Sequence, residues 1–257
     1  MTVGLSALWL SAGVMPERLA DGFYRSLPRK SAVLWVGAHA DDESLVAGAL
    51  LAELSSRGHR VFIVAITDGS SNAKWGGEYN ARSARVRRRF FHQACSIYAA
   101  HGCMTLDFPQ PAHRVAPGGS FLESARDVLE VWRREGLIEK LRELVTAYEP
   151  ACAITLDPDH GLYGHPEHSA AAQAVLEAES RVRVYAAENE FQSVMPGDAD
   201  PGPISWKLPG NGPCGDVSCW DVRSAALKAY KDLFLGGHPP AIEVPPEEQA
   251  TFLRRLN

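Results

Sequence analysis

The sequence lacks the motifs of several common enzyme classes. It contains no G-x-S-x-G nucleophile elbow, no H-E-x-x-H helix, no Walker lysine loop and no G-x-G-x-x-G after its first strand-like run. These absences argue against α/β-hydrolases, zincin proteases, P-loop nucleotidases and ordinary dinucleotide-binding enzymes. Internal repeats and low-complexity tracts are also missing, so we expect a single domain over residues 1–257.

Basic charge and long apolar runs are scarce as well. The formal net charge of −5 argues against a dedicated nucleic-acid binder. The apolar residues 1–15 are too few to cross a bilayer, and no Lys or Arg precedes Arg18, so the charged start of a secretory signal is missing. We therefore expect a cytoplasmic protein in which residues 1–30 form an N-terminal arm. Membrane contact through this arm is the less favoured alternative.

Cysteines are few and odd in number. The chain has five, and none form a C-x-x-C pair, so neither a zinc ribbon nor a redox pair is indicated. Cys214 and Cys219 are close enough in sequence for a local disulfide. In a cytoplasmic protein, however, free buried thiols are the expected state.

Strand-like apolar runs alternate with helical segments along the chain. We expect strands at 31–37, 60–66, 103–108, 151–156 and 181–187, and helices at 45–54, 82–102, 120–149 (broken near Gly136), 170–176, 221–235 and 245–256. This alternation predicts an α/β, Rossmann-like fold with a mostly parallel sheet and helices on both faces. Residues 195–220 are rich in Pro and Gly, which predicts an extended loop or small hairpin that could roof the site.

Two polar clusters follow strand-like runs and open helices. The first is AHADDE at 38–43, and the second is YGHPEH at 163–168. In an open α/β sheet, ligands bind at the carboxyl ends of the strands. Acidic residues at such positions can also serve only as helix caps. Two clusters that both combine histidine with carboxylates are harder to explain as independent caps.

The residue types in these clusters are those of a catalytic metal site. His39 and Asp42 are three residues apart and can point at one ion, and His168 offers a third ligand from another strand end. Two imidazoles and one carboxylate, with positions left for water, are typical of catalytic zinc. Non-haem iron uses the same ligand types, but usually with a shorter interval on a β-sandwich. Zinc is therefore favoured, with Fe²⁺ or another divalent metal as the alternative.

Further titratable residues remain beside these ligands. Asp41 can act as general base toward a metal-activated water. His165 can stabilise an oxyanion and protonate a leaving amine, or it can simply cap its helix. Glu167 can orient one of the two ligand histidines, or it can be solvated.

Candidate substrate contacts lie on three other segments. Asp68 follows the second strand, and Trp75 in the next loop could stack on a sugar, although packing on its own domain is the simpler alternative. The helix over 82–102 begins with five arginines within eight residues, most of which we expect to face solvent. We select Arg88 as the candidate for holding an anionic group of a substrate.

Three motifs together resemble a known family. AHADDE at 38–43, TDG at 67–69 and YGHPEH at 163–168 resemble, in this order, the PIG-L/LmbE-like zinc-dependent N-deacetylases, whose usual motifs are AHPDDE and GHPDH. The resemblance covers residues 31–190. The chain differs from the family pattern at Ala40, Phe91, Gln110, Glu167 and Tyr230, the last of which stands where a histidine is expected.

The resemblance implies roles for residues of this chain. His39, Asp42 and His168 would be the metal ligands, Asp41 the base and His165 the oxyanion or acid partner. It adds one residue, since Tyr163 matches a tyrosine that contacts the reacting carbonyl in some members.

We therefore expect a zinc-dependent hydrolase that removes an N-acetyl or other N-acyl group from an amino sugar, such as an N-acetylglucosamine conjugate. One alternative is a metal-dependent amidase that acts on a non-sugar N-acyl natural product. The other is a sugar- or metabolite-binding protein without catalysis. The expected partner is a small-molecule substrate, and a homo-oligomer is left open.

Overall fold

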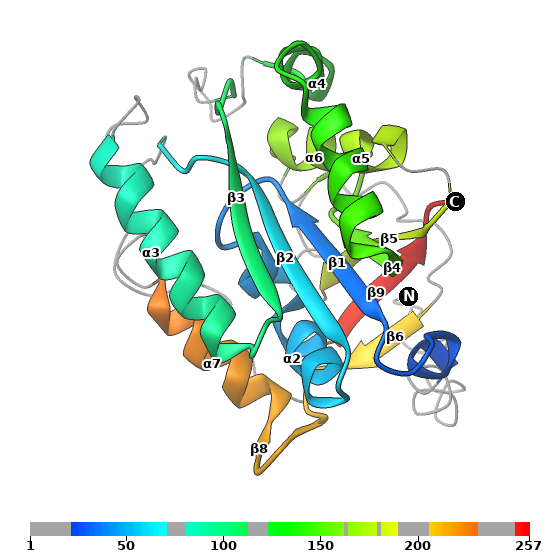
Figure 1. Cartoon of the computed structure of the whole chain (residues 1–257). Helices are drawn as coiled ribbons and strands as arrows, with labels where there is room; N and C mark the ends of the chain where they lie inside the picture. The colour runs from blue at the N-terminus through cyan, green and yellow to red at the C-terminus, as the bar shows by residue number, and fades with distance from the viewer. Residues whose placement is uncertain are drawn as a thin grey trace, which may run out of the picture.

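A twisted central sheet with helices on both faces forms the domain (Figure 1). The computed structural model describes residues 22–70, 81–112, 123–161, 164–178, 181–189, 206–230 and 250–257. The strands of the sheet are β1 (Ala32–Gly37), β2 (Arg60–Thr67), β3 (Gly102–Phe108), β4 (Pro150–Thr155), β5 (Arg183–Asn189), β6 (Trp206–Pro209) and β9 (Ala250–Arg255). The helices are the π-helix η1 (Glu43–Ala47) and the α-helices α2 (Gly48–Ser56), α3 (Ala81–Ile97), α4 (Ala125–Arg134), α5 (Leu137–Tyr148), α6 (Pro166–Ala178) and α7 (Cys219–Ala229).

The sheet has the strand order β3-β2-β1-β4-β5-β9-β6. Strands β1 to β5 are parallel, and β9 runs antiparallel between β5 and β6. The first five strands therefore follow the order of a Rossmann fold, which confirms the expected fold class. The order reverses between β1 and β4, and such a switch point is where the carboxyl ends of the strands leave room for a ligand.

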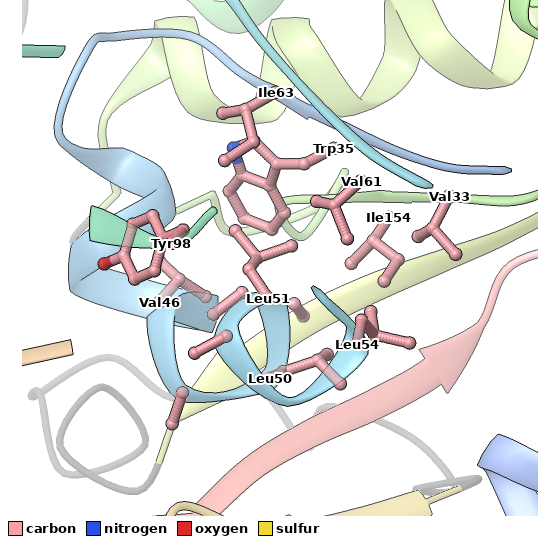
Figure 2. Close-up of a cluster of buried hydrophobic side chains, with 14 of the residues drawn as sticks. Val33, Trp35, Val46, Leu50, Leu51, Leu54, Val61, Ile63, Tyr98 and Ile154 are labelled. Atoms are coloured by element: carbon pink, nitrogen blue, oxygen red, sulfur yellow. The ribbon is translucent and has the colours of Figure 1, made fainter. Parts of the chain in front are cut away.

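Strand β1 is buried along its whole length because helices cover both of its faces. Val33 and Trp35 pack on the face covered by α2, α3 and α7, where Leu50 and Leu51 meet them (Figure 2). Leu34 and Val36 alternate to the other face, which α4, α5 and α6 cover. A strand buried on both faces reads as a continuous apolar run, which is why the sequence predicts β1 so directly.

The predicted helix break at Gly136 is confirmed. Gly136 has a φ of 85°, a left-handed conformation that glycine adopts without strain, and it separates α4 from α5. Within the described residues, no helix is both long and apolar enough to span a bilayer. Of the predicted N-terminal arm, residues 1–21 lie outside the described residues.

Two predictions for the C-terminal part are wrong. Residues 250–255 of the predicted terminal helix form strand β9, because β5 and β6 both supply backbone partners and tertiary pairing overrides local preference. Residues 206–209 of the predicted loop form the edge strand β6. The predicted small hairpin exists as β7 (Pro213–Cys214) and β8 (Val217–Ser218), but it contacts α2 and α7.

Four of the five cysteines form disulfides, so the expectation of free thiols is wrong for them, and the alternative of a local Cys214–Cys219 disulfide is confirmed. Cys214 pairs with Cys219 across a Cα–Cα distance of 4.9 Å, since the β7–β8 hairpin brings them together. Cys95 of α3 pairs with Cys103 of β3 at 6.5 Å, a disulfide that the sequence did not suggest. Cys152 is free and buried in β4.

Candidate active site

The first polar cluster forms a sharp turn between β1 and η1. Asp41 has a φ of 149°, in a region of backbone space that is nearly reserved for glycine. The Asp42 Oδ2 atom accepts the backbone N–H of His39 at 2.8 Å, which closes the turn. Strained backbone of this kind is concentrated at functional sites, so the turn is a candidate for chemistry.

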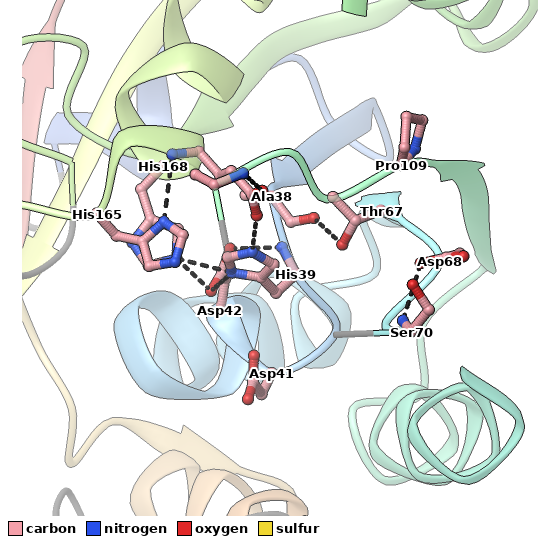
Figure 3. A network of polar contacts seen from close by, with 12 residues as sticks. Ala38, His39, Asp41, Asp42, Thr67, Asp68, Ser70, Pro109, His165 and His168 are labelled. Carbon is pink, nitrogen blue, oxygen red and sulfur yellow. Dashed lines mark hydrogen bonds and ion pairs between the residues drawn. The ribbon is translucent and has the colours of Figure 1, made fainter. Parts of the chain in front are cut away.

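The second polar cluster lies at the start of α6 and reaches the first because β1 and β4 are neighbours in the sheet. His165 precedes the helix, Pro166 is its first residue, and His168 lies in its first turn. Figure 3 shows His165 and His168 converging on His39 and Asp42. The structure thus brings together the histidines and carboxylates that the two sequence motifs predict.

Three side-chain atoms are spaced as ligands of one metal ion. His39 Nδ1 lies 2.9 Å from His168 Nε2, His168 Nε2 lies 3.2 Å from Asp42 Oδ1, and His39 Nδ1 lies 3.7 Å from Asp42 Oδ1. Tetrahedral bonds of about 2.0–2.1 Å place neighbouring ligand atoms about 3.3 Å apart. All three residues are buried. The donor set and its spacing therefore fit a divalent metal.

A buried carboxylate fixes the orientation of His39. Glu167 Oε2 lies 2.5 Å from His39 Nε2, and Glu167 Oε1 accepts the backbone N–H of Ala112 at 2.9 Å. Glu167 is fully buried. A carboxylate on the far nitrogen of a ligand histidine is a common support in metal sites, and it leaves Nδ1 of His39 directed at Asp42 and His168.

The charges of these residues are strongly coupled. Burial disfavours a proton on His39, but hydrogen bonds and proximity to Asp42 and Glu167 outweigh it and raise the pKa of His39 to about 10. Burial likewise opposes ionisation of Asp42, yet His168 and His39 hold its pKa well below the usual value. Asp42 is thus an anion, and a metal must displace a proton from His39.

His165, the predicted oxyanion or acid partner, lies beside the three proposed ligand atoms. Its ligand nitrogen and those of His39 and His168 lie within 4.8 Å of one another. Its Nδ1 accepts the backbone N–H of Glu167 at 3.2 Å, which places the proton of the neutral ring on Nε2. Burial and then the nearby charges of His39 and His168 lower the pKa of His165, so this ring is a neutral donor.

Arg87, not Arg88, lies beside the predicted base. Arg87 Nη2 is 3.6 Å from Asp41 Oδ2, and both side chains are buried. Arg88 is exposed and donates to Asp107 Oδ1 at 2.6 Å, because each step along a helix turns the side chain by about 100°. Burial raises the pKa of the Asp41 carboxyl, and the Arg87 charge opposes this effect.

Three predicted site residues remain, namely Asp68, Trp75 and Tyr163. Asp68 accepts the backbone N–H of Ser70 at 2.8 Å and lies apart from the histidines in Figure 3. Trp75 and Tyr163 lie outside the described residues. The sequence-based prediction missed Arg87. It also missed the hydrogen bond from Tyr230 to Glu43, for which the replacement of an expected histidine by Tyr230 was the available signal.

Relatives with known names match parts of this chain. A 1D-myo-inositol 2-acetamido-2-deoxy-alpha-D-glucopyranoside deacetylase from Corynebacterium efficiens is 32% identical over 159 residues, which are 58% of this chain and 50% of that protein. A protein of the same name from Thermomonospora curvata is 28% identical over 156 residues, 57% of this chain and 51% of that protein. The chain spans about half the length of the curated relatives it matches.

Solved structures share the fold at low sequence identity, and they include enzymes of more than one reaction class. The zinc inhibited form of teicoplanin deacetylase Orf2 has a TM-score of 0.63 and 15% identity, covering 88% of this chain and 99% of its own. The 4-carboxy-2-hydroxymuconate hydratase GalB from Pseudomonas putida has 0.57 and 17%, covering 88% and 96%. The family model PIG-L, described as GlcNAc-PI de-N-acetylase, matches residues 34–179, more than half of the chain, and the chain belongs to this family.

Proposed function

We propose that the chain is a metal-dependent N-deacetylase that hydrolyses the acetamido group of an amino sugar. The observation that carries this proposal is the spacing of His39, Asp42 and His168 as three ligands of one ion. Two additional groups, Asp41 and His165, adjoin these ligands and are not needed for binding alone. Family membership and the deacetylase names of the relatives support the same reaction.

Zinc is the metal we propose, held by His39 Nδ1, His168 Nε2 and an Asp42 carboxylate oxygen. A divalent ion bound there would polarise the amide carbonyl and lower the pKa of a water molecule. Asp41 accepts the proton of the attacking water, and Arg87 favours the ionised carboxylate that this step needs. His165 donates its Nε2–H to the carbonyl oxygen as negative charge develops there.

Hydrolysis is complete when the C–N bond breaks and the leaving nitrogen takes up a proton. Asp41 passes the proton that it took from the attacking water to this nitrogen, while the neutral His165 ring keeps its Nε2–H on the carbonyl oxygen. The products are acetate and a free amine. Tyr163 is proposed, from the family resemblance, as a further contact to the carbonyl.

An N-acetylglucosamine conjugate is the substrate class we propose. The relatives are named for an acetamido-deoxy-glucopyranoside, and a solved neighbour from Pyrococcus horikoshii is an N,N'-diacetylchitobiose deacetylase with a TM-score of 0.58 and 14% identity, covering 93% of this chain and 90% of its own. Asp68, Trp75 and Arg87 are the proposed substrate contacts, with Arg87 in place of Arg88. A cytoplasmic location remains part of the proposal.

Acetate release is the direct test. Zinc-loaded protein is incubated with a panel of N-acetylglucosamine conjugates and with non-sugar N-acetyl compounds, and Asp41→Asn serves as the control. Release from sugars by the wild type alone supports the proposal. Release only from non-sugar compounds would change the proposed substrate class to non-sugar N-acyl compounds. No release from any compound, with one zinc ion bound per chain, would favour a binding protein.

A further inference from the structure

A buried network of polar side chains holds the strained turn at Asp41 in place. A non-glycine residue stays in this backbone region only where its surroundings over-determine it. The backbone N–H of Asp41 donates to Glu43 Oε2 at 3.1 Å. Glu43 is fully buried, so the position of its carboxylate depends on the groups that donate to its second oxygen.

Two hydroxyl groups donate to that second oxygen. Tyr230 Oη donates to Glu43 Oε1 at 2.8 Å, and Ser44 Oγ donates to the same atom at 2.8 Å. Tyr98 Oη in turn donates to Ser44 Oγ at 2.8 Å. These side chains are buried, and buried polar groups are costly unless they are fully hydrogen-bonded. Apolar side chains could fill the same space without this cost. The hydrogen-bonded network therefore indicates a specific arrangement of these side chains.

A buried arginine on the same face of α7 holds the next part of the turn. Arg223 Nε donates to the carbonyl of Ser44 at 2.8 Å, and Arg223 Nη2 donates to that of Leu45 at 2.7 Å. Arg223 and Tyr230 are seven residues apart, which is about two helical turns. A Cβ on Gly48 would lie 2.5 Å from Tyr98 Oη and 2.8 Å from Arg223 Cγ, so glycine is required for this approach.

We propose that Tyr230 is a positioning residue for the general base: its hydroxyl orients Glu43, which holds the backbone N–H of Asp41 and so aims the Asp41 carboxylate. The chemistry of this base rests on the proposed function. The metal ligands do not depend on Tyr230 in the same way, because Asp42 Oδ2 holds the His39 N–H directly and Glu167 holds the His39 ring. Loss of the Tyr230 hydroxyl therefore separates turnover from metal binding.

The test is Tyr230→Phe, which removes a single oxygen atom. The matched control is Tyr148→Phe, since Tyr148 stacks on Phe62 at 3.9 Å on the other side of the sheet. For Tyr230→Phe we expect kcat to fall about tenfold or more, with KM and zinc affinity within about twofold of wild type. In a Glu43→Gln background, the same substitution should cause little further loss, because Tyr230 acts through Glu43.

A second readout does not need activity. Hydrogen exchange of the backbone amides in residues 41–45 should become at least about tenfold faster in Tyr230→Phe and stay unchanged in Tyr148→Phe. Wild-type kcat in Tyr230→Phe, unchanged exchange, or equal losses of zinc and kcat would each overturn the positioning role. An inactive wild type would count against the proposed function, and the exchange rates would then decide the positioning role alone.

Discussion

The Nδ1 atom of His39 lies 2.9 Å from the Nε2 atom of His168, although 129 positions separate the two residues in the chain. Two imidazole nitrogens this close need a proton or a metal ion between them, because two lone pairs would repel. We expect one zinc ion per chain in the wild type and none in His168→Ala, measured by elemental analysis after gel filtration. His160→Ala, at an exposed histidine of the preceding loop, should keep its zinc.

Zinc affinity should rise with pH. The pKa of His39 is raised to about 10 from an ordinary value of 6.5, so at neutral pH the metal must displace its proton. The apparent affinity should increase by about tenfold per pH unit for one released proton, up to about pH 10. Competition with a chelator at several pH values measures this slope. An affinity independent of pH would contradict the His39 assignment.

The same proton links pH to the stability of the protein stripped of metal by a chelator. Because the folded pKa of His39 lies above its unfolded value, the contribution is full below pH 6.5 and is lost as the pH rises towards about 10. Denaturant titrations of chelated protein should thus show a loss of unfolding free energy over this window. His39→Asn should remove this component of the pH dependence.

Asp41→Asn should bind zinc normally and lose most of its turnover. The amide cannot accept the proton of the attacking water, and loss of a general base lowers rates by about a hundred- to ten-thousand-fold. The proposed ligands His39, Asp42 and His168 are untouched, so zinc content should match the wild type. Acetate release at equal zinc loading measures the effect, and unchanged turnover would exclude Asp41 as the base.

Reduction should destabilise the protein without changing its metal ligands. The pairs Cys95–Cys103 and Cys214–Cys219 each close a short loop, and such disulfides contribute roughly 2–3 kcal/mol. Thermal melts with and without reductant should differ, and Cys214→Ser should account for part of the difference.

Alkylation of the protein in fresh cell extract tests the proposed cytoplasmic location. Free thiols in that extract would fit a reducing cytoplasm.

The sequence predicts correctly those parts of the fold and the site that depend on local patterns of residues. Strand β1 reads as an apolar run because both of its faces are covered, and His39 and Asp42 follow it directly. Strand β9 could not be predicted, because it forms only where β5 and β6 offer backbone partners far away in the chain.

Supporting contacts across long sequence distances escape such patterns for the same reason. Tyr230 contacts Glu43 from 187 residues away, so no motif near Asp41 contains it. The choice between Arg87 and Arg88 depends on how α3 is rotated about its axis on the sheet. Packing decides this rotation, and a sequence with several neighbouring arginines does not reveal it.

Arg87 and its neighbour offer a matched pair of variants for the last prediction. Within the described residues, Arg87 Nε has no hydrogen-bond partner and its Nη2 approaches Asp41, whereas Arg88 pairs with Asp107 at the surface. Arg87→Ala should lower kcat/KM at least about tenfold, and Arg88→Ala should leave it within about twofold, since exposed ion pairs contribute little. Without the Arg87 charge the pKa of Asp41 rises further, so the acidic limb of the pH–rate profile should move to higher pH. A profile that stays in place while kcat/KM falls would assign Arg87 to substrate binding alone.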